Sequence, residues 1–372
     1  MAESALGMKA EEFYALLMSE AKAAGLAAAG AVDLDLSQDA FMPHRQRYRD
    51  WIADGKHGDM NYLLRGQERR EDPRLVFPAA QSILCVAFPY ANSPNGATSA
   101  KKGVQYARYI RDNDYHKVIL TSLEVLMERV KAKSAESTLH WKVCVDTSAV
   151  LERSWAALAG LGWIGKNTLL IHPQLGSYFF IGSVLINHKT QQGPQLLPNY
   201  CGNCTRCLDR CPTQAFTSSG SLDSKRCVSY WTLEKRGELA LSEEQKTRIS
   251  NWVAGCDVCQ EVCPFNQKPV KNNIAPPLTS GAEHLFSWES LLAESDEGYR
   301  VRVRNSALSR VKPHQFSRNL AITLFNAIEN GDLILTPEFQ LLIHQRLARA
   351  RDSEDRASIV EWERCITLTR TD

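Results

Sequence analysis

Eight of the eleven cysteines of this chain lie in one stretch, between residues 200 and 264. The first run, CGNCTRCLDRCP, has two, two and three residues between successive cysteines, and a proline follows the last one. This is the ferredoxin spacing for a [4Fe–4S] cluster, in which three thiolates on a tight loop hold one cluster and the fourth points to a second. The run consists of Cys201, Cys204, Cys207 and Cys211.

A second run, GCDVCQEVCP, supplies further ligands but lacks its first cysteine. Val253 stands at that position, and Cys227, between the two runs, is the obvious substitute. We therefore predict two clusters with crossed ligation. One is assigned Cys201, Cys204, Cys207 and Cys263, and the other Cys211, Cys227, Cys256 and Cys259.

A structural zinc module is the alternative interpretation, because zinc also takes cysteine ligands. Such a module needs four ligands in two separated pairs, whereas this stretch offers eight in crossed ferredoxin order. The pattern therefore favours two [4Fe–4S] clusters. Of the remaining cysteines, Cys85 and Cys144 are expected in the core, and no role is predicted for Cys365.

Length and composition describe an ordinary globular protein. The 372 residues suffice for two or three domains, and 44% of them are hydrophobic. A net charge of +2 excludes a globally basic nucleic-acid binder but allows a local basic face. The first residues are amphipathic rather than a signal peptide, and no stretch approaches the ~20 apolar residues of a membrane span. Together with the thiolate ligands, this predicts the cytoplasm.

Residues 1–190 are predicted to form an α/β domain, because helical and strand patterns alternate along them. Helices are expected over 11–24, 114–133 and a segment ending near 160, and buried strands over 26–32, 82–90 and 141–148, with a loop at 92–103. In open parallel sheets, ligands bind at the carboxyl ends of strands. Asp146 follows such a strand and is a candidate site residue. A helix N-cap is the alternative for its carboxylate.

Two weaker motifs lie in the same region. Gly160, Gly162 and Gly165 have the order of a dinucleotide fingerprint but follow a helix instead of opening one, so nicotinamide binding is disfavoured. We expect them to let the backbone approach a bulky flat ligand. Asp114 and His116 begin a pattern that supplies cobalt ligands in some corrinoid enzymes, but Ile119 replaces its glycine. His116 is therefore predicted to be a helix-start residue on the wall of the site.

The rest of the chain divides at a linker over 268–278. Residues 191–280 are predicted to be the iron–sulfur module, and residues 281–372 a helical, HEAT-like region, because amphipathic patterns repeat there. Six basic residues without an acid lie between 300 and 318; they form either a solvated face or, as we predict, an anion-binding stripe. They are Arg300, Arg302, Arg304, Arg310, Lys312 and Arg318.

The chain resembles the epoxyqueuosine reductases, cobalamin-dependent iron–sulfur enzymes that complete queuosine biosynthesis in tRNA. The resemblance covers nearly the whole chain and is weakest in the last ninety residues. Its most specific strings are DTSAVLER and LGWIGKNTLL. The others are GDMNYL, RREDP, QYARYIRDNDYH, GSYFFIGSVL, CGNCTRCLDRCPTQAF, RCVSYWTLEKRG and GCDVCQEVCPFN.

The resemblance implies a function and a set of site residues. The N-terminal domain would hold cobalamin without a protein ligand to cobalt, and the clusters would pass it single electrons to give cob(I)alamin, a strong reductant. The epoxide of epoxyqueuosine at the tRNA wobble position would become the cyclopentene of queuosine. Asp146 would donate a proton to the epoxide oxygen, its pKa raised by the apolar corrin face. A low-potential electron donor is implied as a partner, and a monomer is expected.

The same resemblance assigns contact residues. The predicted tRNA contacts are Lys235, Arg236 and the anion-binding stripe. The predicted cobalamin contacts are Arg70, Tyr109, Asp146, Leu170, Ile181, Ser229, Asp257 and Val258.

Two other functions compete with this one. A small-molecule corrinoid reductase of the reductive dehalogenase type shares the cofactors, but the absence of an export signal and the basic helical region disfavour it. An electron carrier without catalytic activity would leave the α/β domain and Asp146 unexplained.

Overall fold

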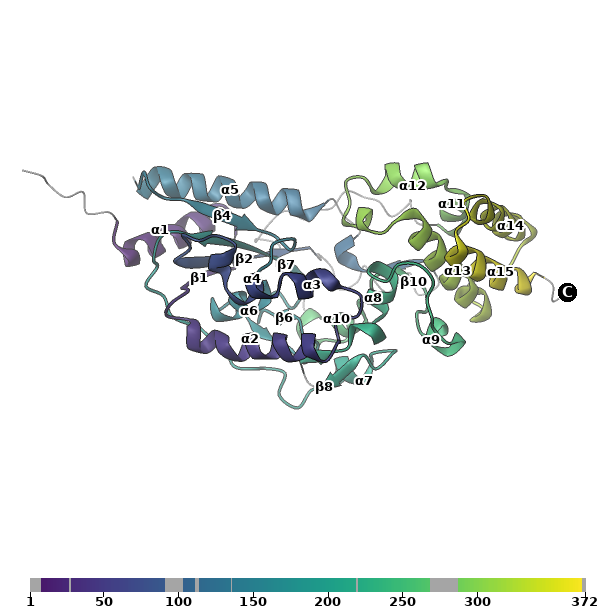
Figure 1. The fold of residues 1–372 in the computed structure, drawn as a ribbon, viewed down its shortest axis with the longest axis horizontal. Coiled ribbons are helices and arrows are strands. Elements are labelled where there is room, and N and C mark those ends of the chain that lie inside the picture. The colour runs from purple at the N-terminus through teal and green to yellow at the C-terminus, as the bar shows by residue number, and fades with distance from the viewer. Residues whose placement is uncertain are drawn as a thin grey trace, which may run out of the picture.

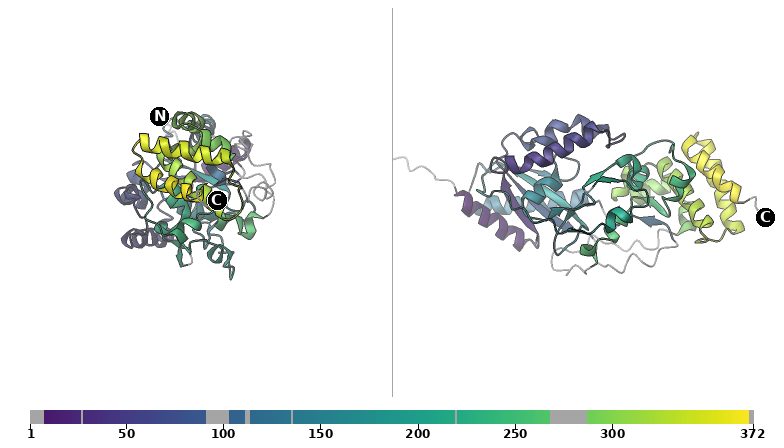
Figure 2. Two further views of the ribbon diagram at one scale, coloured as in Figure 1. Left: turned by 90° about the vertical axis from the view of Figure 1, so that its right-hand side faces the viewer. Right: turned by 90° about the horizontal axis from the view of Figure 1, so that it is seen from below.

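The computed structural model describes residues 8–26, 28–90, 103–110, 114–134, 136–218, 220–267 and 287–369. The molecule is elongated, with a β-sheet at one end, the C-terminal helices at the other, and the cysteine-bearing segments between them (Figures 1 and 2). The predicted linker at 268–278 lies outside the described residues, as does most of the predicted loop at 92–103. No helix in the described part of the chain is long and apolar enough to cross a membrane.

The N-terminal sheet has four strands in the order β1-β2-β7-β4, and all neighbouring strands are antiparallel. The prediction of mixed helices and strands is confirmed, but the analogy with a parallel sheet is wrong. The strands are β1 (Ala29–Asp33), β2 (Ser82–Pro89), β4 (Trp141–Cys144) and β7 (Phe179–Ile186). The central strand β2 is buried throughout, as expected for a continuous apolar run. The strand β4 is shorter than predicted and partly exposed, because it lies at the sheet edge.

Helices cover both faces of this sheet (Figure 1). On one face, α1 (Ala10–Ala23) and α5 (Tyr115–Ser134) pack against the sheet through Phe13, Leu17 and Leu123, which are fully buried. On the other face lie α2 (Gln38–Ala53) and α6 (Glu152–Leu158), where Phe41 stacks on Trp155 at 4.3 Å between ring centroids. Cys85 and Cys144 are fully buried in this core, as predicted.

The glycines after α6 serve chain packing. Gly160 has a φ of +83°, which ends the helix. A Cβ on Gly162 would lie 2.2 Å from the backbone oxygen of Ile171, and one on Gly165 would meet the Ile171 side chain. These two residues allow close packing in the hairpin of β5 (Trp163–Ile164) and β6 (Leu170–Ile171). The structure thus gives these two glycines a packing role, and the approach of their backbone to a flat ligand stays a prediction.

Short elements connect the two ends of the molecule. Between β1 and β2 lie α3 (Asn61–Arg65), α4 (Gln67–Glu71) and η1 (Pro73–Leu75). After β2, β3 (Gln105–Tyr106) and η3 (Arg108–Ile110) leave the N-terminal sheet; β3 pairs in parallel with β10 (Trp252–Ala254). Tyr106, Ala107 and Ile110 join the hydrophobic core of the C-terminal helices. The predicted boundaries at 190 and 280 remain predictions, and this packing crosses them.

The cysteine-bearing region consists of short helices and one hairpin. They are α7 (Arg206–Asp209), β8 (Phe216–Ser218), β9 (Ser221–Leu222), η4 (Ser224–Arg226), α8 (Val228–Leu233), α9 (Glu243–Thr247), α10 (Val258–Glu261) and η5 (Pro264–Asn266). A capping box formed by Ser242 and Gln245 starts α9.

The C-terminal part is helical in its described residues, as predicted. It contains α11 (Trp288–Ala293), α12 (Asp296–Val303), η7 (Ala307–Arg310), α13 (Pro313–Glu329), α14 (Pro337–Asp352) and α15 (Arg356–Leu368). The helix α13 is central: it packs on α15 and on β10, and Leu320, Ala321 and Leu324 are fully buried. Pro313 and Pro337 occupy first turns, where the missing N–H costs nothing. A HEAT-like repeat remains a prediction.

Candidate functional site

The seven cysteines of the two runs and Cys227 fall into the two predicted sets by the thiols that influence one another. Burial raises the pKa of the Cys207 thiol to about 11, and the neighbouring thiols that add to this effect are Cys201, Cys263 and Cys204. Burial also raises the pKa of Cys259 well above its usual value, here reinforced by Cys256, Cys227 and Cys211. The structure thus brings Cys227 to the second set and Cys263 to the first, in the crossed order that the spacing predicts.

Local donors point at several of these sulfurs. The indole N–H of Trp163 donates to Cys201 Sγ at 3.3 Å, and the backbone N–H of Ala215 donates to Cys211 Sγ at 3.3 Å. Burial raises the pKa of Cys227, while the backbone N–H groups of Tyr230 and Ser229 lower it. Donors of this kind favour the thiolate that a cluster requires and tune the cluster potential.

The missing cysteine of the second run has a structural reason. Val253 is the middle residue of β10 and is fully buried in the core of the C-terminal helices. A ligand at that position would face this core. Cys227 instead precedes α8 as its N-cap residue.

Asp146 lies just beyond the end of β4, in a strained loop. Its φ is +52°, a left-handed conformation that is uncommon for residues other than glycine and often marks functional sites. Its side chain is half exposed and accepts hydrogen bonds through Oδ2, from Tyr115 Oη at 3.1 Å and with His116 Nε2 at 3.4 Å. It does not cap α6, whose N-cap residue is Leu151. The N-cap alternative is therefore excluded.

The predicted rise in the pKa of Asp146 concerns a bound corrin and stays a prediction; the chain itself shifts this pKa in the other direction. The hydrogen bond from His116 holds the pKa of the Asp146 carboxyl below its usual value; burial acts in the opposite direction, and the charge of Arg310 supports His116. The pKa of this carboxyl in the chain itself is therefore lowered, not raised. The pKa of His116 is raised, chiefly by its hydrogen bond to Asp146.

Two neighbours of Asp146 were not predicted as partners. His116, at the start of α5 as expected, also contacts Asp114 Oδ1 through Nδ1 at 2.7 Å. Glu152 Oε1 accepts from the backbone N–H of Asp146 at 3.0 Å, which holds the loop to α6. Burial, followed by the charge of Asp146, raises the pKa of Glu152 well above its usual value. The spacing of Asp114 and His116 was a sequence signal for the first neighbour, but none pointed to Glu152.

Residues from distant segments belong to the electrostatic surroundings of Asp146. Asp146 and Arg310 both act on the pKa of Tyr109, which burial raises, and Asp257 acts on it as well. Asp257, which follows the cluster ligand Cys256, accepts from the backbone N–H of Arg108 at 2.7 Å. Tyr109 is therefore close enough to both Asp146 and Asp257 for their charges to raise its pKa.

The other predicted cobalamin contacts are partly in place. Arg70 is buried, and its charge acts on Glu152. Ile181 lies near the start of β7, at the end of the sheet where β4 leads to Asp146. Ser229 and Val258 flank the second cysteine set through their backbone N–H groups. Leu170 is buried in the hydrophobic core against which Ile181 also packs, and its contact with cobalamin remains a prediction.

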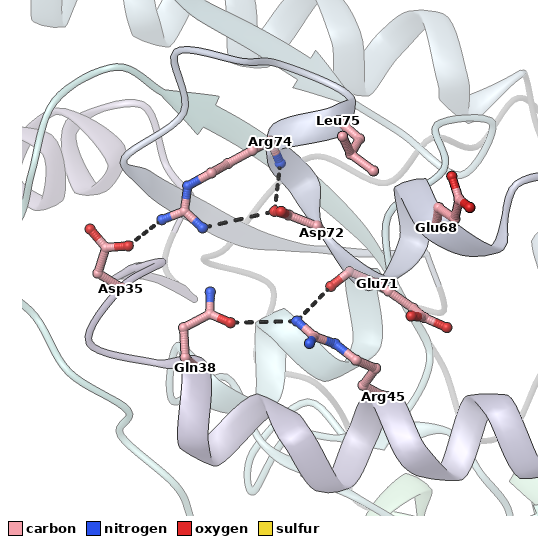
Figure 3. Close-up of a pocket in the computed structure, with 8 residues that line it drawn as sticks. All are labelled: Asp35, Gln38, Arg45, Glu68, Glu71, Asp72, Arg74 and Leu75. Carbon is pink, nitrogen blue, oxygen red and sulfur yellow. Dashed lines mark hydrogen bonds and ion pairs between the residues drawn. The ribbon is translucent and has the colours of Figure 1, made fainter.

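A separate open pocket of about 400 Å³ lies beside α2 and α4 (Figure 3). None of the predicted site residues lines it. Its charged groups largely satisfy one another: Arg74 pairs with Asp35 and Asp72, and Arg45 donates to the backbone oxygen of Glu71 at 3.0 Å. The pocket presents a paired ionic cluster without a catalytic arrangement.

The predicted anion-binding stripe is not one exposed surface. Arg318 is fully buried and donates to backbone oxygens of Trp231, Lys235 and Gly237. Arg302 makes a two-pronged contact with Glu294, at 2.6 and 2.8 Å. For both residues the prediction of a solvent-facing phosphate contact is wrong, because their guanidinium groups hold the fold together.

The remaining members of the stripe are accessible to different degrees. Arg310 is ion-paired with Glu234 and, as its effect on Asp146 shows, lies at the candidate site. Arg300, Arg304 and Lys312 are exposed, as is Arg236, while Lys235 pairs with Asp59 at 2.6 Å.

Arg318→Ala is expected to lower the free energy of unfolding by about 2–4 kcal/mol, because several buried carbonyl oxygens lose their donor. The surface change Arg304→Ala serves as the matched control and should leave the thermal midpoint unchanged. The tRNA contact predicted for Arg304 from the sequence would make this variant weaken tRNA binding instead and reduce the slope of log affinity against log salt by about one. Thermal melting and filter binding measure the two effects; equal melting points for both variants would contradict the assigned roles.

Two family models match separate parts of the chain. The 4Fe-4S double cluster binding domain matches residues 200–266, and the domain described as epoxyqueuosine reductase QueG, DUF1730 matches residues 70–147. The first match decides against a zinc module, so the prediction of two iron–sulfur clusters is confirmed at the level of the domain.

Curated relatives extend the likeness. The epoxyqueuosine reductase of Cyclobacterium marinum is 34% identical over 276 residues, which are 74% of this chain and 86% of that protein. That of Pseudomonas aeruginosa is 35% identical over 314 residues, 82% of each chain. The chain belongs to the epoxyqueuosine reductase family. Members of this family are oxidoreductases.

Solved structures of epoxyqueuosine reductases share the fold. One from Bacillus subtilis, with its catalytic aspartate loop swung out of the active site, aligns with a TM-score of 0.76 and covers 97% of this chain and all of its own. Another, with an epoxyqueuosine-modified tRNA stem loop, also has a TM-score of 0.76 and covers 97% of this chain and 99% of its own. Both are 24% identical to this chain.

Proposed function

We propose that this chain reduces the epoxide of epoxyqueuosine to queuosine at the anticodon wobble position of tRNA, the final step of queuosine biosynthesis. The observation that carries the proposal is the placement of Asp146. This half-exposed carboxylate lies on a strained loop. Its charge and that of Asp257, which follows the predicted cluster ligand Cys256, both raise the pKa of Tyr109. Family membership supplies the substrate class, and the stem-loop structure of a relative supports tRNA.

Cobalamin is the cofactor we propose for the space beside Asp146, and the residues there fit it. Tyr109 interacts electrostatically with Asp146, and Arg70 with Glu152. Ile181 lies at the end of the sheet where β4 leads to Asp146. Both ring nitrogens of His116 are engaged by carboxylates, so this residue is not placed to ligate cobalt. That arrangement agrees with a cofactor held without a protein ligand to its metal. Reduced cobalamin would supply the electrons for opening the epoxide, and electron transfer from the clusters would return cobalamin to its reduced state.

The chain's own residues provide the proton and the orientation. Opening an epoxide leaves an alkoxide, which needs a proton in or near the transition state. Asp146 Oδ2 is the atom placed to deliver it, and Tyr115 orients this carboxylate through its hydroxyl. Glu152 fixes the loop by accepting from the backbone of Asp146.

We assign tRNA binding to the exposed basic residues Arg236, Arg300, Arg304 and Lys312. Contacts of this kind hold phosphates and set the register without reading sequence. A base in an anticodon loop is splayed out at lower cost than one in a duplex. We further propose that the chain works in the cytoplasm as a monomer and takes electrons from a low-potential donor protein.

Nucleoside mass analysis tests the function. The protein, reconstituted anaerobically with iron, sulfide and cobalamin, is incubated with epoxyqueuosine-containing tRNA and a low-potential chemical reductant. We expect queuosine to replace epoxyqueuosine, and omission of cobalamin to abolish the conversion. Unchanged epoxyqueuosine in the complete reaction, with both clusters and corrin absorbance present, would refute the proposal.

A further inference from the structure

Four polar side chains form a connected chain at the end of the sheet. Asp114 Oδ1 contacts His116 Nδ1 at 2.7 Å, His116 Nε2 contacts Asp146 Oδ2 at 3.4 Å, and Tyr115 Oη donates to the same Asp146 oxygen at 3.1 Å. The imidazole ring also stacks on Tyr115, with 4.1 Å between centroids. Because each ring nitrogen of His116 faces a carboxylate, the doubly protonated imidazolium satisfies both contacts and the neutral ring satisfies only one.

The reaction consumes more protons than one carboxyl group carries. Conversion of the epoxide to an alkene breaks two C–O bonds, forms one C=C bond and uses two electrons and two protons, with the oxygen released as water. The electrons come from the low-potential donor through the clusters. Asp146 can hold only one proton at a time. Its carboxylate must therefore be protonated again between the two transfers, either by a second side chain or directly by water.

We propose that His116 is a positioning residue that stores the proton for Asp146 and reloads it during each turnover. The proton on His116 Nε2 moves to Asp146 Oδ2, and from there to the epoxide oxygen as the first C–O bond breaks. The ring regains a proton from water, since 30% of its side chain is exposed, and the second transfer accompanies loss of the hydroxyl as water. This role rests on the proposed function and adds a residue to it.

The charged surroundings support storage on the histidine. The hydrogen bond to Asp146 raises the pKa of His116, burial opposes this shift, and the hydrogen bond to Asp114 adds to it. His116 in turn lowers the pKa of Asp146, as does Arg310 on η7. The other groups that interact with Asp146 include Tyr115, Glu152, Arg153, Tyr62 and Tyr109. These contacts favour an imidazolium on His116 beside a carboxylate on Asp146.

The pH dependence follows from this assignment. A raised pKa keeps His116 protonated to higher pH, and the stored proton is lost as the pH rises through that pKa. With a saturating chemical reductant, the single-turnover rate should fall over this range. His116→Gln retains a side-chain N–H donor but stores no proton, so its rate should be about 100-fold lower and should lose this pH dependence. Added imidazole should restore part of the rate to His116→Ala.

A measurement without substrate or cofactor separates this proposal from the proposed function. Histidine side-chain NMR of the full chain, with His116→Gln identifying the signal, should give a His116 pKa above 6.5. Asp146→Asn should lower that pKa. A wild-type pKa at or below 6.5, or one unchanged by Asp146→Asn, would overturn the storage role even if the enzyme is fully active.

The kinetic control is His344→Gln, an exposed position on α14 that should keep the wild-type rate and pH profile. His116→Gln with a wild-type rate and profile would also overturn the proposal. If wild-type enzyme fails to convert epoxyqueuosine, the proposed function fails, while the NMR result still decides where the proton resides.

Discussion

Asp146→Asn is expected to reduce turnover of epoxyqueuosine by about 10²- to 10⁴-fold, the usual contribution of a positioned general acid. Asparagine tolerates the left-handed backbone of this position, so the change removes the acid with little added strain. Both clusters should be retained because no predicted cysteine ligand changes, and the corrin absorbance should be retained because the other predicted cobalamin contacts remain. Anaerobic single-turnover assays, with iron analysis of the same samples, measure the effect.

Two further variants interpret that result. Asp146→Ala should lose activity to a similar extent and some stability in addition, because alanine is less tolerant of a positive φ. Asp352→Ala, at the exposed end of α14, should behave as wild type. Full activity of Asp146→Asn would end the assignment of this residue as the proton donor.

Cys227→Ala is expected to remove one cluster and leave the other. Iron should fall from about eight to about four atoms per chain, because Cys227 belongs with Cys211, Cys256 and Cys259. Turnover should be abolished, since the cluster held by this set is proposed to deliver the electrons. Iron and sulfide analysis after anaerobic reconstitution, together with electron paramagnetic resonance of the reduced protein, checks the prediction.

Cys365→Ala is the matched control, because this cysteine is fully buried in the helical core and donates to the backbone oxygen of Ala321. It should keep about eight iron atoms with a modest loss of stability. If Cys227→Ala also keeps eight, the crossed ligand assignment is wrong and another residue completes the second cluster.

Sequence spacing was sufficient for the clusters because their ligands lie on short loops. The distances between cysteines along the chain set which sulfurs can share a cluster, and only Cys227 had to be inferred by elimination. The long helix at 115–134 was also predictable from its helical periodicity, and the buried strand at 82–89 from its continuous apolar run.

The catalytic arrangement depended on contacts that no local pattern encodes. His116 and Asp146 lie thirty residues apart, and their pairing follows from the packing of α5 against β4. Sheet direction could not be read from the order of elements, since helices and strands alternate in antiparallel sheets as well. A run of basic residues likewise does not reveal which members face inward, and Arg318 is buried because backbone oxygens surround it.

The pairing of β3 with β10 has a consequence for how the protein is made. Tyr106 leaves the ribosome long before Ala254, its strand partner, and before the helices that cover it. Until those residues are synthesised, the apolar segment around Tyr106 lacks the residues against which it packs in the folded protein. Contacts so distant in sequence also form slowly. Nascent chains halted before the last helices should therefore depend on chaperones.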